Sequence, residues 1–249
     1  MKVVDLVIIT PTLNEEFYIG KLLTSIQFQT VQPKEIIIVD AKSRDGTIKE
    51  IKKYQKDLPQ LQFYRIPKYS ISRQRNLGVK NSTAKKILFI DADMKFKEKD
   101  ALENLLHEAK EKRADFAIPQ ILPLSKKKLD EFLYMLHNGI PKTLKPIKPL
   151  ATTQCLFVKR SILKKAGLFD EEIKVGEDFE LVSRLKKFGG KFAILQNSKI
   201  YSSTRRLEKD GRFKYLTMLG FSALMITVLG YKKNPVQKKY DFGNHPHLD

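Results

Sequence analysis

The 249-residue sequence has few of the side chains that build redox and metal centres: it contains one cysteine, four histidines and no tryptophan. A single cysteine excludes a disulfide within the chain, and Cys155 falls in the strand-like run TTQCLFVKR, where we expect a small core residue. Two of the histidines lie in the stretch NHPHLD, so a zinc-type Cys/His cluster is not expected. Catalytic chemistry in this chain must therefore rest on carboxylates.

The signatures of several function classes are also missing. The chain has no P-loop lysine motif, no G-x-G-x-x-G after its first strand and no recognisable nucleic-acid-binding module. Its start, MKVVDLVIITPTLNEE, lacks a long apolar region followed by a small-residue cleavage site, and we expect no signal peptide. Together with the lone cysteine, this predicts a reducing, cytoplasmic location.

Charge, in contrast, is present in large excess of one sign. Lysine and arginine number 47 against 28 aspartate and glutamate residues, which gives a formal net charge of +19. Without a nucleic-acid module, we expect this charge to attract phosphorylated substrates or anionic lipid rather than nucleic acid. A protein peripheral to the inner face of the cell membrane fits this charge. A solvated, lysine-rich surface with no partner is the alternative.

A long uncharged run, YLTMLGFSALMITVLGY, extends from Tyr215 to Tyr231 and has basic residues on both sides. Its length is near the lower limit for a membrane-spanning helix. Basic flanks and aromatic ends also suit a helix that lies at a membrane surface. A buried helix or a homodimer interface is the third reading, and the sequence leaves all three open.

The first half of the chain alternates strand-like and helix-like segments. Apolar runs at residues 3–10, 35–40, 62–66 and 86–94 are typical of strands buried on both faces, and segments with helical spacing of apolar residues separate them. Residues 13–27 predict the first helix, with Asn14 as its cap. This repetition predicts a Rossmann-like α/β domain with a mostly parallel sheet flanked by helices.

Three of these strands end in polar clusters, TPTLNEE, DAKSRDG and DADM. Ligands of such sheets bind beyond the carboxyl ends of the strands, so we expect the clusters to meet in one crevice. Asp91 and Asp93 in DADM repel each other unless a cation or hydrogen-bond donors satisfy them. Magnesium is usually held by one or two carboxylates and substrate phosphates, so a diphosphate–metal platform is one reading. A helix cap or an exposed turn is the other.

Taken in order, VIITPTLNEE, IIIVDAKSRDGT, SRQRNLGV, ILFIDADM and GLFDEEIKVGEDFELVSRLKKFG resemble the motifs of glycosyltransferase family 2, an inverting family with the GT-A fold. The resemblance runs from about Leu6 to Lys191. It implies a single GT-A catalytic domain over residues 1–211. Residues 212–249 would then be a C-terminal apolar and basic extension containing an apolar helix, with membrane association as one role.

The resemblance also implies roles for single residues. The nucleotide-binding set would be Thr10, Pro11, Glu15, Asp40, Arg75 and Asp91. Asp93 would ligate Mn²⁺ or Mg²⁺, with Asp91 facing the ribose or a metal-bound water. Family members usually carry two aspartates where this chain has Asp40 and Ala41, a departure that puts the nucleotide preference in doubt.

In the motif GEDFE, Asp178 stands at the position of the family's catalytic base. Displacing a nucleoside diphosphate from a sugar requires stabilisation of the leaving group and a base on the opposite face. The alternative for Asp178 and its neighbour Glu177 is a pair of helix N-terminal acids. We group Glu177 with Arg205 and Arg206 as candidates for contacting the diphosphate or an anionic acceptor, because guanidinium groups match phosphate geometry. A solvated basic turn is the alternative for the arginines.

These features predict a glycosyltransferase of the hexosyltransferase type. It would move a sugar, with metal and with inversion, from a UDP- or GDP-sugar to a glycan or polyprenyl-phosphate acceptor. A sugar-nucleotidyltransferase is one rival, although it should show a glycine-rich, basic first loop, which TPTLNEE is not. A non-catalytic basic protein that binds lipid or nucleic acid is the other, and it would bind polyanions with steep salt dependence.

Overall fold

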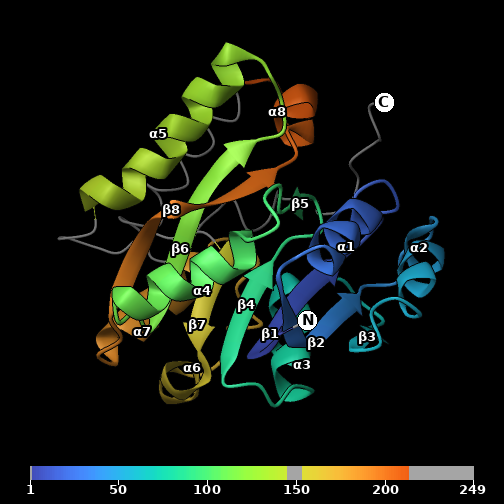
Figure 1. Ribbon diagram of the computed structural model, residues 1–249, viewed down its shortest axis with the longest axis horizontal. Helices are drawn as coiled ribbons and strands as arrows, with labels where there is room; N and C mark the ends of the chain where they lie inside the picture. Colours follow the sequence, from blue (N-terminus) through green and yellow to red (C-terminus); the bar gives the residue numbers. More distant parts are fainter. Residues whose placement is uncertain (1, 145–152, 213–249) are drawn as a thin grey trace.

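The alternating apolar segments of the sequence build one eight-stranded sheet in this computed structural model, which describes residues 2–144 and 153–212 (Figure 1). The strands are β1 (Lys2–Thr12), β2 (Val31–Asp40), β3 (Leu61–Arg65), β4 (Lys86–Ile90), β5 (Met94–Lys95), β6 (Phe116–Pro123), β7 (Cys155–Lys159) and β8 (Phe192–Ser202). The helices are α1 (Ile19–Gln27), α2 (Thr47–Tyr54), α3 (Ile71–Lys80), α4 (Ala101–Glu111), α5 (Lys128–Leu144), α6 (Arg160–Ala166), α7 (Glu177–Lys187) and α8 (Arg205–Asp210).

The strand order is β3-β2-β1-β4-β7-β6-β8-β5. Strands β1 to β4 run parallel to one another, and β6 and β8 share their direction, whereas β7 and β5 pair antiparallel with their neighbours. The predicted Rossmann-like, mostly parallel sheet is therefore confirmed. The carboxyl ends of β1, β2 and β4 consequently lie along the same edge, where the three polar clusters follow them.

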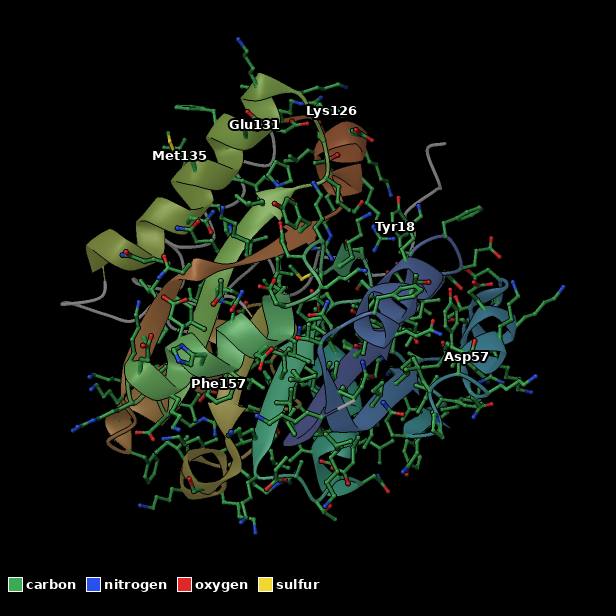
Figure 2. The ribbon with its side chains drawn as sticks, in the orientation of Figure 1. Tyr18, Asp57, Lys126, Glu131, Met135 and Phe157 are labelled. Atoms are coloured by element: carbon green, nitrogen blue, oxygen red, sulfur yellow. The ribbon has the colours of Figure 1, made fainter. Side chains whose placement is uncertain are left out.

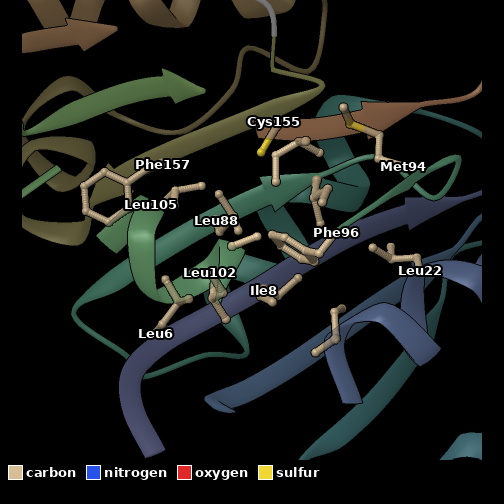
Figure 3. Close-up of a cluster of buried hydrophobic side chains, with 14 of the residues drawn as sticks. Leu6, Ile8, Leu22, Leu88, Met94, Phe96, Leu102, Leu105, Cys155 and Phe157 are labelled. Atoms are coloured by element: carbon tan, nitrogen blue, oxygen red, sulfur yellow. The ribbon is translucent and has the colours of Figure 1, made fainter. Parts of the chain in front are cut away.

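Both faces of the sheet are buried, which explains why its strands are continuous apolar runs. In β1, Leu6 and Ile8 pack into one apolar cluster and Val7 and Ile9 into a second, since successive side chains of a strand point to opposite faces. The first cluster, which Figure 3 shows around Leu88, also contains Cys155. The cysteine is fully buried in β7, as predicted for a core residue.

The predicted cap at Asn14 is wrong. Helix α1 begins at Ile19, with Tyr18 at its N-cap, whereas Asn14 lies in a loop with a left-handed backbone (φ 55°). The Asn14 side-chain oxygen accepts a hydrogen bond from the Arg44 backbone N–H (3.0 Å), and the backbone N–H of Asn14 donates to Ser43 Oγ (2.8 Å). The side chain of Asn14 is thus bonded to Arg44, a residue distant in sequence, and does not cap the helix.

Residues 213–249 lie outside the described residues, and with them the predicted apolar helix at residues 215–231 and nearly all of the predicted extension at residues 212–249. Among the helices of residues 2–144 and 153–212, none is long and apolar enough to cross a membrane.

The buried carboxylate of Glu108 stabilises a bulge in β8, where this strand pairs with β6. The pairing of β6 with β8 is interrupted after Leu195, and residues 196–198 bulge out of β8. Glu108 of α4 accepts hydrogen bonds from the Gln196 N–H (2.7 Å) and the Ser198 hydroxyl (2.7 Å), and its ion pair with Lys112 spans 2.9 Å. The Gln196 and Asn197 N–H groups and the Ser198 hydroxyl therefore stay hydrogen-bonded although these three residues are outside the pairing of β8 with β6.

We expect Glu108→Ala to lower the free energy of unfolding by about 2–3 kcal/mol at neutral pH, because it removes several hydrogen bonds to one buried charge. Chemical denaturation measures the change. The matched control is Glu111→Ala on the same helix, whose carboxylate is exposed and whose loss should cost no more than about 0.5 kcal/mol. Equal effects of the two substitutions would contradict this role for Glu108.

The same carboxylate predicts a pH dependence. Burial alone would raise the pKa of Glu108, but hydrogen bonds from Lys112, Ser198 and Gln196 outweigh it and hold the pKa below its usual value. A lowered folded-state pKa means that the stabilisation is complete above the unfolded-state pKa and is lost as the pH falls through the folded-state pKa. The stability difference between the parent protein and Glu108→Ala should therefore shrink on acidification.

Candidate functional site

A pocket opens at the carboxyl ends of β1 and β4. It is lined by residues 11–15 at the end of β1 and just after it, Tyr69, Ile71 and Gln74 at α3, residues 91–93 after β4, and Arg205 and Arg206 at the start of α8. The first and third polar clusters thus meet, as the topology predicts. A wider groove of about 570 Å³ lies along α1, α2 and β5, but it contains none of the predicted site residues.

The second polar cluster supports the pocket from behind. The Glu15 N–H donates to Thr47 Oγ1 (2.7 Å), and the Glu16 N–H donates to Asp45 Oδ2 (3.2 Å), so the loop after β1 is fastened to the loop after β2. These bonds fix the path of residues 14–16 and hence the direction in which Glu15 points.

Asp40 is fully buried and does not line the pocket. Its carboxylate accepts hydrogen bonds from the Thr12 hydroxyl (3.2 Å) and from the Ser43 N–H (3.0 Å) and hydroxyl, and Arg65 lies 3.4 Å away. Thr10, also buried, does not line the pocket either. Of the predicted nucleotide-binding residues at the ends of β1 and β2, Pro11 and Glu15 face it.

Asp91 is paired with the buried Arg75 of α3. Arg75 Nη2 donates to Asp91 Oδ1 (2.9 Å) and to the Thr153 carbonyl oxygen (3.3 Å), and Nη1 donates to Glu177 Oε1 (3.3 Å). The guanidinium also lies over the Phe169 ring, 5.3 Å from its centroid. Burial raises the pKa of Asp91, while the charge of Arg75 acts in the opposite direction.

Asp93 is paired with a second arginine. Arg205 Nε lies 3.3 Å from Asp93 Oδ2, and Arg205 Nη2 donates to Glu15 Oε1 (2.5 Å). The guanidinium also stacks over the Tyr18 ring at 4.5 Å. Burial raises the pKa of Glu15 to about 7, against the lowering effect of Arg205. Each carboxylate of the D-x-D motif thus has its own arginine, which answers the repulsion problem that the sequence posed.

Glu177 and Asp178 are the first two residues of α7, after Gly176 turns the chain with φ 85°. Glu177 is buried against Arg75, whereas Asp178 is half-buried. Asp178 Oδ1 accepts from the Phe179 N–H (2.8 Å), and Oδ2 accepts a longer bond from the Thr153 N–H (3.4 Å). Burial raises the pKa of both carboxyls, and the Asp178 charge adds to the rise at Glu177.

Sequence reasoning missed three residues of this region. Gln74 is fully buried and donates to the carbonyl oxygens of Thr12 (2.9 Å) and Val39 (2.7 Å), so it spans the ends of β1 and β2. Tyr69 lines the pocket, and burial raises the pKa of its hydroxyl, which therefore stays protonated. Thr153 contacts both Arg75 and Asp178 through its backbone. Of the three, only Gln74 could have been suspected from the sequence, because it lies in the polar segment SRQRN, between motif residues.

The oxygen atoms of the pocket fit a hard divalent cation such as Mn²⁺ or Mg²⁺. Asp91 and Asp93 face the pocket, and Glu15 Oε2 is buried without a hydrogen-bond partner. No group of three or more Asp, Glu, His or Cys residues within residues 2–144 and 153–212 is arranged to hold an ion by itself. One or two carboxylates together with substrate phosphates are the usual ligands of magnesium, and Asp91 and Asp93 fit that ligand set.

Comparison with known proteins places the chain among transferases. Residues 7–167 match the family model described as glycosyl transferase family 2. The chain is 26% identical over 232 residues to the poly(ribitol-phosphate) beta-N-acetylglucosaminyltransferase TarS of Staphylococcus aureus, an alignment that covers 88% of this chain and 39% of TarS. It is also 26% identical over 216 residues to the minor teichoic acid biosynthesis protein GgaB of Bacillus subtilis, covering 83% of this chain and 23% of GgaB. The chain thus spans well under half the length of these relatives.

Solved structures show the same architecture. S. aureus TarS 1–349 in complex with UDP-GlcNAc superimposes with a TM-score of 0.64 at 24% identity, covering 82% of this chain and 58% of that one. The mannosyltransferase PcManGT from Pyrobaculum calidifontis, in complex with GDP-Man and Mn²⁺, gives 0.63 at 17% identity, covering 86% and 64%. The predicted GT-A fold is therefore confirmed. Because the family model also matches more than half of its residues, the chain belongs to glycosyltransferase family 2.

Proposed function

We propose that this protein transfers a sugar from a nucleotide-sugar donor to an acceptor hydroxyl, with a divalent metal and with inversion at the anomeric carbon. The observation that carries the proposal is the arrangement of two arginine–carboxylate pairs, Arg75–Asp91 and Arg205–Asp93, at the strand ends of one pocket. Carboxylates there suit a metal shared with a diphosphate, and arginine suits the diphosphate itself.

The lining of the pocket suits two parts of the donor. Pro11 and Glu15 line the side of the pocket formed by the end of β1 and its loop, where the nucleoside would lie, and Asp91, just after β4, also lines the pocket. Arg205, which is hydrogen-bonded to Glu15, and Arg206 line it too and would bind the diphosphate oxygens. A bound Mn²⁺ or Mg²⁺ would stabilise the leaving diphosphate as a Lewis acid. A UDP-sugar is the first donor to test, because TarS binds UDP-GlcNAc.

Asp178 is better suited than Glu177 to accept the acceptor's proton. Glu177 is buried and ion-paired with Arg75, whereas Asp178 is half-buried and its Oδ2 accepts a long, 3.4 Å bond from the Thr153 N–H. The raised pKa of Asp178 brings its basicity nearer to that of a useful general base. Glu177 then acts through Arg75, by holding the guanidinium that also contacts Asp91.

For the acceptor, we propose a hydroxyl of a phosphate-bearing glycan or polyol chain. The names of TarS and GgaB refer to poly(ribitol-phosphate) and to teichoic acid. The net charge of +19 favours an anionic acceptor. A polyprenyl phosphate is the second candidate, and it would need no strong base because a phosphate is already ionised.

The direct test is donor binding followed by product analysis. A UDP-sugar with Mn²⁺ should raise the melting temperature more than Mn²⁺ or the UDP-sugar alone, because a ligand of the native state stabilises it. UDP-GlcNAc and GDP-mannose are the first pair to compare. Transfer to poly(ribitol-phosphate), with the anomer of the product read by NMR, then tests acceptor and inversion. Absence of a metal-dependent shift with every nucleotide-sugar would contradict the proposal.

Substitution of Asp93 tests the metal assignment. We expect Asp93→Ala to reduce metal-dependent nucleotide affinity at least about tenfold, since one of the carboxylates available to the ion is lost. Calorimetry with UDP in the presence and absence of Mn²⁺ separates this loss from a general effect. Asp57→Ala, at an exposed aspartate beyond α2, is the matched control and should bind like the parent (Figure 2). Unchanged metal dependence in Asp93→Ala would remove Asp93 from the ligand set.

Substitution of Asp178 tests the base. Asp178→Asn keeps the size of the side chain and should leave donor affinity within about twofold, while turnover falls by about 10²–10⁴ because proton transfer is lost. Steady-state kinetics with a hydroxyl acceptor gives both values. Turnover equal to that of the parent protein would assign the proton to another group or point to a phosphate acceptor.

A further inference from the structure

Helix α5 is apolar on both of its sides. Its inner side packs Leu133 into the protein, with Asp130 also buried there. Its outer side carries Leu129, Phe132, Met135 and Leu136, which are 52%, 50%, 59% and 40% exposed. We call these four residues the α5 outer face. Figure 2 shows Met135 pointing away from the sheet.

The α5 outer face is a continuous stripe. Residues 129, 132 and 136 are three and four positions apart, so their side chains are neighbours on one side of the helix. The other large apolar side chains that are exposed in the described ranges, Val3, Phe17, Phe28 and Phe188, lie on other elements, and Phe28 shares one groove with Phe17 and another with Val3. An amphipathic helix normally turns its polar side to water, and here that side is largely apolar.

Basic residues border this stripe. Lys126, Lys127 and Lys128 are exposed at the beginning of the helix, and the chain as a whole carries +19. Asp130 adds no negative charge to the surface, because it is buried and bonded to Arg212 at 2.6 Å and 3.1 Å. Within the part of α5 whose side chains the structure describes, Glu131 is the exposed acidic residue. An apolar stripe with lysines at its rim complements an anionic lipid surface.

The chain also leaves the described structure at this place. Arg212, the last described residue, is ion-paired with Asp130 at the start of α5, and α8 lies beside that end of the helix (Figure 1). The uncharged sequence from Tyr215 to Tyr231 follows after two further residues. The described chain therefore ends next to the lysine-bordered end of the α5 outer face, and an apolar sequence follows it.

We propose that the α5 outer face docks on an anionic membrane surface. Leu129, Phe132, Met135 and Leu136 enter the boundary between head groups and acyl chains, and the lysines at the start of α5 contact the acidic head groups. A second copy of the chain is the less favoured occupant, because each copy carries the same large positive charge. The docking surface is separate from the donor pocket, so this inference stands or falls independently of the proposed transfer reaction.

The absence of tryptophan from the sequence provides a direct reporter. Phe132→Trp places one tryptophan in the α5 outer face of the full chain, and Phe28→Trp places one at another exposed phenylalanine, after α1. With vesicles of phosphatidylcholine and phosphatidylglycerol, emission at position 132 should shift to the blue and become quenchable by brominated lipid. Emission at position 28 should not change. No change at 132, or an equal change at both positions, would overturn the assignment.

A matched pair of substitutions measures the contribution of the face. Phe132→Glu should weaken co-sedimentation with the same vesicles at least about tenfold, because an exposed aromatic ring that would enter the membrane is replaced by a charge. Phe28→Glu should leave it unchanged. Binding should fall with added salt and be weaker to phosphatidylcholine alone, since the lysines contribute. Circular dichroism of each variant establishes that it is folded.

The competing occupants give different results. A parent protein that dimerises in sedimentation analysis, becomes monomeric with Phe132→Glu and ignores vesicles would show a self-association surface instead. Vesicle binding that is identical in the parent and in Phe132→Glu would assign membrane contact to another segment. Either result overturns the proposal.

Discussion

The buried guanidinium of Arg75 is the interaction on which the site depends. Its side chain is almost fully enclosed, and it binds Asp91 after β4, Glu177 at the start of α7 and the carbonyl oxygen of Thr153. A buried cation is tolerated only with such partners, and the carboxylates need it equally. The segment after β4 and the start of α7 are thus joined through one residue, which fixes the placement of Asp91 relative to Glu177.

Much of the fold could be predicted because its determinants are local. Strands buried on both faces must be apolar throughout, so β1, β2 and β4 can be recognised in the sequence as continuous apolar runs. The position of β7 between β4 and β6, antiparallel to both, could not be predicted, because strand pairing is decided by partners distant in sequence. Asn14 failed as a cap for the same reason: the residues that bind its side chain and N–H, Arg44 and Ser43, belong to another loop.

The site divides in the same way. Asp91 and Asp93 stand out locally, as carboxylates that end an apolar strand. Asp40 also ends an apolar strand, and the sequence marks it as a site residue just as clearly. Its carboxylate instead accepts hydrogen bonds from Thr12 and Ser43 behind the pocket, which no pattern in the strand reveals. Arg205 was identified by residue type alone, and its place between Glu15 and Asp93 follows only from the folded chain. Thr153 acts through its backbone, and backbone contacts carry no sequence signature.

The contact between Glu15 and Arg205 joins residues that are 190 positions apart. The Ser203 N–H likewise donates to the Asp93 carbonyl oxygen (2.9 Å). The segment before α8 therefore fixes the turn between β4 and β5. Contacts of such long sequence separation form late, because the loop-closure entropy must be overcome first. On the ribosome, β1 to β4 are all synthesised well before residues 203–206. The pocket is therefore completed late, because it requires residues beyond β8 that join strand ends made much earlier.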